Sequence, residues 1–167
     1  MRNSKKLKIK KAGIADLKSF LPVFKISVKK QFPEYSLKAK NLFLNRHFTK
    51  KNFIEDFKKR RIDLVLAYIN NQIAGYLIIL PPYGGVSYIS WLAVNDSFQG
   101  KGIGSALLKE CEKIAKRKGA HKVHLWTSKR NIKFYKKNKW ILVGSIPENY
   151  FGADDCLFYK TIKKPRY

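Results

Sequence analysis

The chain has 167 residues, of which 45% are hydrophobic, so it suits one well-packed domain over residues 1–167 and is short for two. Lys and Arg number 36 against 11 Asp and Glu, and the formal net charge of +25 creates a field that attracts anionic partners. No apolar run is long enough to span a bilayer, and Met1 to Lys6 contain no apolar signal-peptide core, so we expect a cytoplasmic protein with no membrane partner.

The basic residues accompany no zinc-finger, RNP-like or helix-turn-helix pattern. The excess of Lys over Arg, together with many Asn, Ile, Tyr and Phe, is typical of an AT-rich genome. The basic runs are spread along the chain, at Lys5–Lys11, Lys50–Arg61, Lys113–Lys118, Lys129–Lys139 and Lys160–Arg166. The sequence therefore predicts weak, salt-sensitive association with nucleic acid rather than dedicated binding.

A strand and several helices are predicted in the first third of the chain. Leu7–Lys11 alternates as a strand, and Ile14–Lys30 reads as a helix that Pro22 bends. Pro33 ends that helical pattern. Apolar residues at helical spacing predict one or two further helices within Ser36–Arg61.

Strands and helices then alternate. Asn70-Asn71 separates two apolar, partly β-branched runs, which predicts a hairpin, while Pro81-Pro82 and Gly84-Gly85 are expected to turn the chain. The expected strands are Ile62–Ile69, Ile73–Leu80, Tyr88–Val94, His121–Thr127, Trp140–Ile146 and Cys156–Ile162, and the expected helices are Lys101–Lys118 and Asn131–Asn138. This order predicts an α/β sandwich around a mixed, mostly antiparallel sheet of about six to seven strands, flanked by about four to five helices.

Two cysteines lie within these elements. Cys111 falls on the apolar face of its predicted helix, and Cys156 lies in the last predicted strand. We expect both to be buried and reduced, with no disulfide and no metal site.

The most informative motif lies where the strand ending at Val94 meets the next predicted helix. There the chain reads Gln99-Gly100-Lys101-Gly102-Ile103-Gly104. Glycine lets the backbone approach a ligand closely, and the first N–H groups of a helix have no intrahelical partner. These free donors and the positive end of the helix dipole predict a cradle for the phosphates of a bound cofactor.

Two familiar glycine motifs do not fit this loop. The dinucleotide-binding pattern G-x-G-x-x-G fails because the glycines fall on every second position. The Walker pattern fails because no G-K-[ST] closes the loop.

With Ser105 and its flanks, the Q-x-x-G-x-G loop resembles the acetyl-CoA pyrophosphate loop of the GNAT superfamily of N-acetyltransferases. Ile89–Phe98 is similar to that family's fourth strand and turn, and Phe134–Trp140 to its helix-to-strand junction. The resemblance covers about residues 62–162 and implies the GNAT fold, with a first strand and acceptor-side helices in residues 1–61 and the acetyl-CoA site in 62–162. It implies an acyltransferase that moves acetyl directly from acetyl-CoA to a primary amine.

The resemblance also implies roles for particular residues. Pantetheine would pair with the fourth strand at Leu92, Ala93 and Val94, where a strand N–H polarises the thioester carbonyl. Tyr135 takes the position of the general acid, since a phenol is protonated at neutral pH. The pyrophosphate would be held by the amides of Gln99, Gly100, Lys101, Gly102, Ile103, Gly104 and Ser105.

Two positions depart from the family pattern. Ser128 stands where many members place a cofactor-binding asparagine, and Asn131 is expected to replace it. Tyr88 stands at the place of a glutamate general base, and no carboxylate occurs from Ile69 to Val94. The general base is therefore unassigned, and the candidates are His124, Glu148, Asp154 and a water chain.

The missing carboxylate bears on the acceptor, because an α-amine, with a pKa of about 7.7–8.0, needs a weaker base than a lysine amine at about 10.4. The protein's field disfavours polycationic acceptors unless an acidic pocket is formed by Glu34, Glu55, Asp56 or Asp154-Asp155. The segment Asn149–Asp155 is similar to the tail of acetyltransferases acting on protein N-termini.

We therefore expect a peptide or protein α-amine as acceptor, with a small-molecule amine as the alternative. Two other classes of function remain as alternatives: a non-catalytic CoA sensor and a nucleic-acid or ribosome-binding module. The chain is expected to be a monomer or a dimer.

Overall fold

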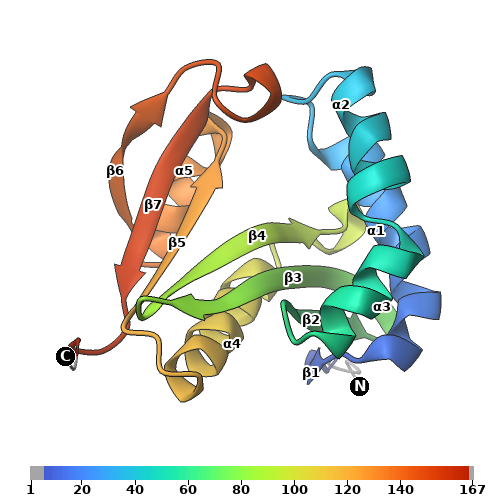
Figure 1. The fold of residues 1–167 in the computed structure, drawn as a ribbon, viewed down its shortest axis with the longest axis horizontal. Coiled ribbons are helices and arrows are strands. Elements are labelled where there is room, and N and C mark those ends of the chain that lie inside the picture. Colours follow the sequence, from blue (N-terminus) through green and yellow to red (C-terminus); the bar gives the residue numbers. More distant parts are fainter. Residues whose placement is uncertain (1–5, 166–167) are drawn as a thin grey trace, which may run out of the picture.

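The computed structural model describes residues 6–165, and seven strands in this range form one sheet in the order β1-β2-β3-β4-β5-β7-β6. Neighbouring strands are antiparallel except β4 and β5, which are parallel (Figure 1). The strands are β1 (Lys8–Lys11), β2 (Asp63–Ile69), β3 (Gln72–Tyr83), β4 (Val86–Val94), β5 (Lys122–Thr127), β6 (Ile141–Ile146) and β7 (Asp155–Thr161). The mixed, mostly antiparallel sheet expected from the sequence is confirmed.

Helices cover both faces of the sheet, and each face has its own apolar core. Because side chains alternate along a strand, Leu64 and Leu66 of β2 pack with α1, α2 and α3, whereas Val65 and Ala67 pack with α4 and α5. The helices are α1 (Leu17–Gln31), α2 (Leu37–Leu42), α3 (Lys50–Lys58), α4 (Ile103–Arg117) and α5 (Ile132–Lys137). In the part of the chain that the structure describes, no helix is long and apolar enough to cross a membrane.

The predicted hairpin is confirmed, and one predicted turn is corrected. Asn70 and Asn71 have φ angles of +49° and +62°, the left-handed values that a tight two-residue hairpin needs. Gly84-Gly85 turns β3 into β4, but Pro81-Pro82 lies within the end of β3, where the pairing register shifts. A proline has no N–H to donate, so strands tolerate it at such irregular positions.

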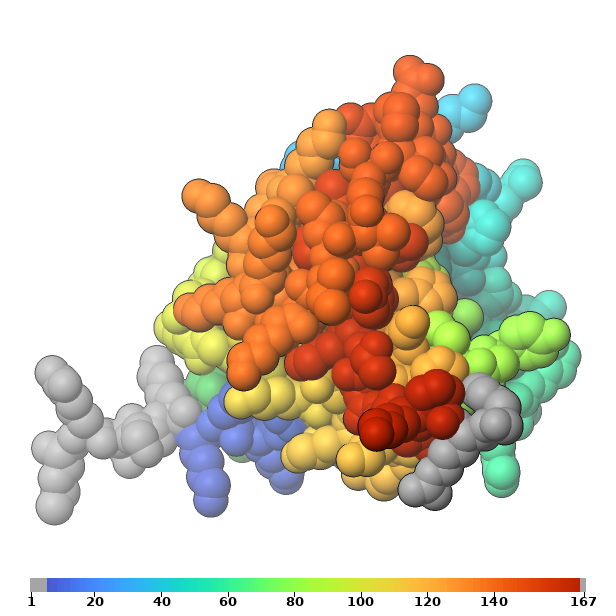
Figure 2. Space-filling view, turned by 90° about the vertical axis from the view of Figure 1, so that its left-hand side faces the viewer, coloured from blue at the N-terminus to red at the C-terminus, as the bar shows by residue number. Residues whose placement is uncertain are grey.

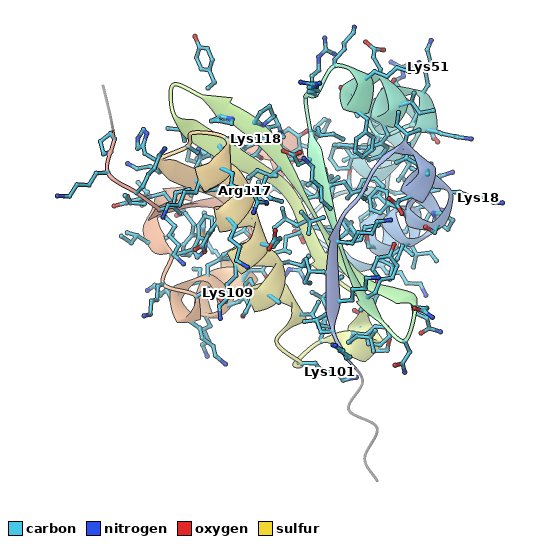
Figure 3. The ribbon with its side chains drawn as sticks, turned by 90° about the horizontal axis from the view of Figure 1, so that it is seen from below. Lys18, Lys51, Lys101, Lys109, Arg117 and Lys118 are labelled. Carbon is cyan, nitrogen blue, oxygen red and sulfur yellow. The ribbon has the colours of Figure 1, made fainter. Side chains whose placement is uncertain are left out.

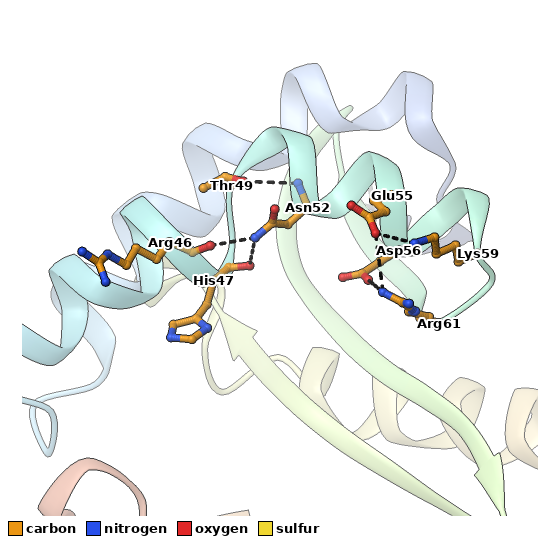
Figure 4. A network of polar contacts seen from close by, with 8 residues as sticks. All are labelled: Arg46, His47, Thr49, Asn52, Glu55, Asp56, Lys59 and Arg61. Carbon is orange, nitrogen blue, oxygen red and sulfur yellow. Dashed lines mark hydrogen bonds and ion pairs between the residues drawn. The ribbon is translucent and has the colours of Figure 1, made fainter.

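The region Ser36–Arg61 contains a π-helical segment, Phe43–His47, between its two helices. Asn52 joins this segment to α3, because its side-chain amide donates to the carbonyls of Arg46 and His47 at 2.7 and 3.0 Å (Figure 4). The Thr49 hydroxyl caps α3 by accepting from the Asn52 N–H at 3.2 Å. These contacts hold together the π-helical segment and the start of α3, the two elements on either side of Phe48.

Basic side chains are distributed around the molecule. Figure 3 labels Lys18 on α1, Lys51 on α3, and Lys109 and Arg117 on α4, so these basic side chains come from helices on both faces of the sheet. Figure 2 shows the face that the C-terminal third of the chain covers, with α4 below it. Nucleic-acid association stays a prediction.

A buried carboxylate links three elements of the core. Asp63, whose side chain is 4% exposed, forms ion pairs with Lys11 Nζ at 2.7 Å and Lys118 Nζ at 2.5 Å. It thereby ties the start of β2 to β1 and to the end of α4. Burial raises the pKa of the Asp63 carboxyl, but the two ammonium groups outweigh burial and hold it below its ordinary value.

We predict that Asp63→Asn lowers the free energy of unfolding at pH 7 by about 1–3 kcal/mol. The folded-state pKa is lowered, so this stabilisation is present above the unfolded pKa of about 3.9 and is lost as the pH falls through the folded value. Urea unfolding at pH 7 and at pH 2.5 measures the difference, which should shrink at the lower pH. Asp56→Asn is the control and should have a far smaller effect; a loss that does not change with pH would contradict the assignment.

Candidate active site

The site begins at the point where β4 and β5 separate. The two strands pair only from Val86 to Ile89, with Lys122 to Leu125 opposite. The pairing with β3 shifts register around Ser90, and beyond it β4 has a partner strand only on its β3 side. A β-bulge bends a strand and re-aims the residues beyond the bulge. The end of β4 therefore offers backbone groups to a ligand.

The glycine loop joins this strand end to α4. Gly100 and Gly102 have φ angles of +73° and +76°, in the left-handed region that favours glycine. Gly102 is the N-cap of α4, and a Cβ at either position would meet no atom within 4 Å, so space is open beside the loop. Gly104 differs, because a Cβ there would lie 3.0 Å from Phe134 Cζ, so it allows α4 and α5 to pack closely.

A cleft of about 580 Å³, which we call the glycine cleft, runs along this loop. Of the residues that the sequence predicted for the cofactor and for catalysis, it brings together Leu92, Ala93, Val94, Gln99, Gly100, Gly102, Ile103, Gly104, Ser105, Asn131 and Tyr135. Lys101 does not line the cleft. Its Nζ donates to the Ser97 carbonyl at 2.8 Å and lies 5.3 Å from the centre of the Phe98 ring, so the side chain folds back on the preceding turn.

The sequence did not indicate the contribution of α1 to this cleft. Gln31 Nε2 donates to the Val94 carbonyl at 2.9 Å and to Asp96 Oδ1 at 2.8 Å, and the Gln99 amide donates to the same two groups. Gln31 Oε1 is buried with no hydrogen-bond partner in the described structure. Three basic residues line the cleft, namely Lys30, Arg130 and Lys137.

A second cavity of about 430 Å³ adjoins the glycine cleft, and we call it the aromatic chamber. Phe32, Leu92, Asn131 and Tyr135 line both cavities, so the two meet there. The aromatic residues that line the chamber are Phe32, Tyr35, Phe48, Tyr88, Trp91, Trp126, Tyr135 and Tyr150. They come from the segment between α1 and α2, from β4 and β5, from α5, and from the segments before α3 and β7.

Tyr135 lies at the junction of the cavities and is 5% exposed. Burial raises the pKa of its phenol, and a hydrogen bond with the Thr127 side chain only partly opposes that shift, so the phenol carries its proton at neutral pH. Asn131 Nδ2 donates to Thr127 Oγ1 at 2.8 Å. The ring packs against Phe158, with centroids 5.3 Å apart, so the hydroxyl is held in place.

Of the base candidates that the sequence offered, only His124 lines the chamber. Its ring lies against Tyr88, with centroids 5.1 Å apart, and burial lowers its pKa, so the imidazole is neutral at pH 7. Asp154 pairs with Lys129 at 3.3 Å and accepts from the Glu148 N–H at 3.1 Å, and neither acid lines the glycine cleft or the aromatic chamber.

Two carboxylates do line the chamber, Glu34 and Asp155. Arg130 lies 3.2 Å from Glu34, whereas Asp155, 3% exposed, accepts from Asn149 Nδ2 at 3.1 Å. Strand alternation was the available signal for Asp155: Cys156 belongs to the core with α4 and α5, so its neighbour faces the other side.

The other predicted features lie outside the chamber. Glu55 and Asp56 sit on α3, where they pair with Lys59 and Arg61 (Figure 4). Both cysteines are free and buried, as expected. Within residues 6–165, no cluster of His, Cys, Asp or Glu could hold a metal ion.

Comparisons with known proteins place the chain in a family. Residues 27–140 match the model of the acetyltransferase (GNAT) family. Glucosamine 6-phosphate N-acetyltransferase 1 of Dictyostelium discoideum is 32% identical over 106 residues, covering 56% of this chain and 68% of that protein. Glucosamine 6-phosphate N-acetyltransferase of Trypanosoma brucei brucei is 32% identical over 89 residues, 47% of this chain and 60% of the relative.

Solved structures agree on the fold. PaiA N-acetyltransferase from Thermoplasma acidophilum, solved with coenzyme A, has a TM-score of 0.74 at 23% identity and covers 93% of this chain and 99% of its own. YncA from Salmonella typhimurium, solved with acetyl-CoA, has a TM-score of 0.76 at 17% identity, with 97% of each chain covered. The chain belongs to the acetyltransferase (GNAT) family of N-acetyltransferases.

Proposed function

We propose that this N-acetyltransferase transfers the acetyl group of acetyl-CoA directly to the primary amine of a small molecule. The observation that carries the proposal is that the glycine cleft and the aromatic chamber meet at Tyr135. One cavity can hold the donor and the other the acceptor, with Tyr135 in the wall of both. Such an arrangement brings two reactants together without a covalent enzyme intermediate.

The glycine cleft fits acetyl-CoA. The amides from Gln99 to Ser105 would hold the pyrophosphate, and Lys30, Arg130 and Lys137 supply positive charge beside the phosphates. The buried, unpaired Gln31 Oε1 is an acceptor that suits an amide N–H of pantetheine extended along β4. When bound, acetyl-CoA supplies the acetyl group and a thiolate leaving group.

The chain's own residues then account for the transfer. The amine nitrogen attacks the thioester carbonyl, a C–N bond forms, and the C–S bond breaks. A backbone N–H in the segment Leu92–Val94 stabilises the developing oxyanion, and Tyr135 donates its proton to the leaving thiolate. His124, neutral and in the chamber, takes the amine proton directly or through water.

Aromatic contacts of the segment before β7 support a small acceptor. Tyr150 and Phe151, which precede β7, pack against Phe43 with centroids 5.9 and 4.8 Å apart, and so join this segment to the helices on the far side of the site (Figure 1). The two curated relatives are also named for a small amino sugar. A peptide or protein α-amine is the second candidate, because Asn149 and Asp155, from the segment that suggested it, line the chamber wall.

We predict that Gly102→Asp weakens acetyl-CoA binding at least about tenfold, because a carboxylate would face the pyrophosphate. Gly102→Asn is the matched control, since it has the same shape and the same strained φ without the charge. Calorimetric titration with acetyl-CoA measures both variants. Equal affinities for the Asp and Asn variants would place the pyrophosphate elsewhere.

Tyr135→Phe is expected to lower kcat about 100-fold or more, because the leaving thiolate loses its proton donor. The acetyl-CoA dissociation constant should change little, since the ring keeps its packing against Phe158. Release of CoA with an amine that the wild type acetylates gives kcat, and titration gives the affinity. An unchanged kcat would assign Tyr135 to packing alone.

A further inference from the structure

The aromatic chamber has the opposite charge character to the rest of the protein. Of the described residues that line it, none is Lys or Arg, although the chain carries a net charge of +25. Its acidic residues are Glu34, which Arg130 pairs with, and Asp155. The chamber therefore presents one carboxylate that has no cationic partner among the contacts of the described structure.

Asp155 is held where a bound molecule would meet it. It is the first residue of β7, it is 3% exposed, and its Oδ2 accepts from Asn149 Nδ2. Burial raises the pKa of Tyr88 to about 12, with Tyr150 and Asp155 adding to the shift, so this phenol stays neutral beside the carboxylate. A buried carboxylate is costly unless a cation or several hydrogen-bond donors compensate it.

The walls of the aromatic chamber are aromatic and firmly packed. Trp91 is fixed by edge-to-face contacts with Phe32 and Phe48, at centroid distances of 4.8 and 5.3 Å. Tyr35 and Tyr150 meet edge to face at 6.2 Å. Aromatic faces favour apolar bodies and attract cations, with about 0.5–2 kcal/mol per cation–π contact.

We propose that the acceptor is a primary amine on an apolar body of aromatic size with no anionic group, and that Asp155 binds its ammonium. This inference rests on the proposed function. It distinguishes the chain from the curated relatives, whose names specify a phosphorylated amino sugar, because a phosphate in this chamber would meet carboxylates and no lysine or arginine. Before attack, the bound ammonium releases one proton to water, and the freed lone pair attacks the thioester; His124 takes the second nitrogen proton as the C–N bond forms, while Tyr135 protonates the leaving thiolate.

The test is a binding measurement on the full chain saturated with CoA. The probes are tryptamine, indole-3-propionate with the same ring but a carboxylate, and glucosamine 6-phosphate. Tryptamine should bind at least about tenfold more tightly than either anionic probe. Tighter binding of either anionic probe would overturn the proposal.

Asp155→Asn should weaken tryptamine binding at least about tenfold and leave CoA affinity unchanged. Asp154→Asn is the matched control, because the adjacent carboxylate is 49% exposed, pairs with Lys129 and does not line the chamber. In steady-state assays, Asp155→Asn should raise the KM for tryptamine more than it lowers kcat. Equal tryptamine binding by the wild type and Asp155→Asn would overturn the role of Asp155.

Failure of the proposed function gives a different result. If the chain binds tryptamine through Asp155 but transfers no acetyl to any amine, the transferase mechanism fails and the ligand class stands. If the chain acetylates amines but Asp155→Asn binds tryptamine as tightly as the wild type, the transfer mechanism stands and this inference fails.

Discussion

The site depends on one constraint in the sheet, which is that β4 and β5 pair for only a short stretch and then separate. Up to Ile89 and Leu125 the two strands share a parallel ladder, and beyond this point β4 has no partner strand on that side within residues 6–165. The separation leaves strand backbone free for an extended ligand. Leu92, which lies beyond this point on β4, lines both the glycine cleft and the aromatic chamber.

The charges of the protein are divided between the two sides of this opening. On the side of the glycine loop, Lys30, Arg130 and Lys137 accompany the free amides at the start of α4, an environment that stabilises phosphates. In the aromatic chamber, carboxylates face aromatic walls, an environment that stabilises a cation. Net charge describes the solvent-exposed surface of this protein and says little about the aromatic chamber.

Local sequence signals predicted much of the fold. Asn70-Asn71 identified the hairpin because only a few residues tolerate two successive positive φ angles. The spacing of Gly100, Gly102 and Gly104 predicted the glycine loop between β4 and α4. The geometry of this loop is set by residues adjacent in the chain, so a local pattern can reveal it. Pro81-Pro82 was misplaced because proline is as compatible with an irregular strand end as with a turn.

The features that the sequence did not reveal depend on contacts between distant segments. Gln31 reaches the end of β4 across 63 positions, and no local pattern signals that contact. Asp155 and Asp154 look alike in the sequence, yet one is buried in the chamber wall and the other is half exposed beside Lys129. Strand alternation distinguishes them only once the start of β7 is known, and the pairing of β7 between β5 and β6 sets that start at Asp155.

The most direct test is a crystal structure of the chain with CoA and tryptamine. The account predicts the pyrophosphate against Gln99 to Ser105, the thiol beside Tyr135, and the amine within hydrogen-bond distance of Asp155, with the two ligands meeting between β4 and β5. An amine bound outside the aromatic chamber, or CoA bound away from the glycine loop, would contradict it.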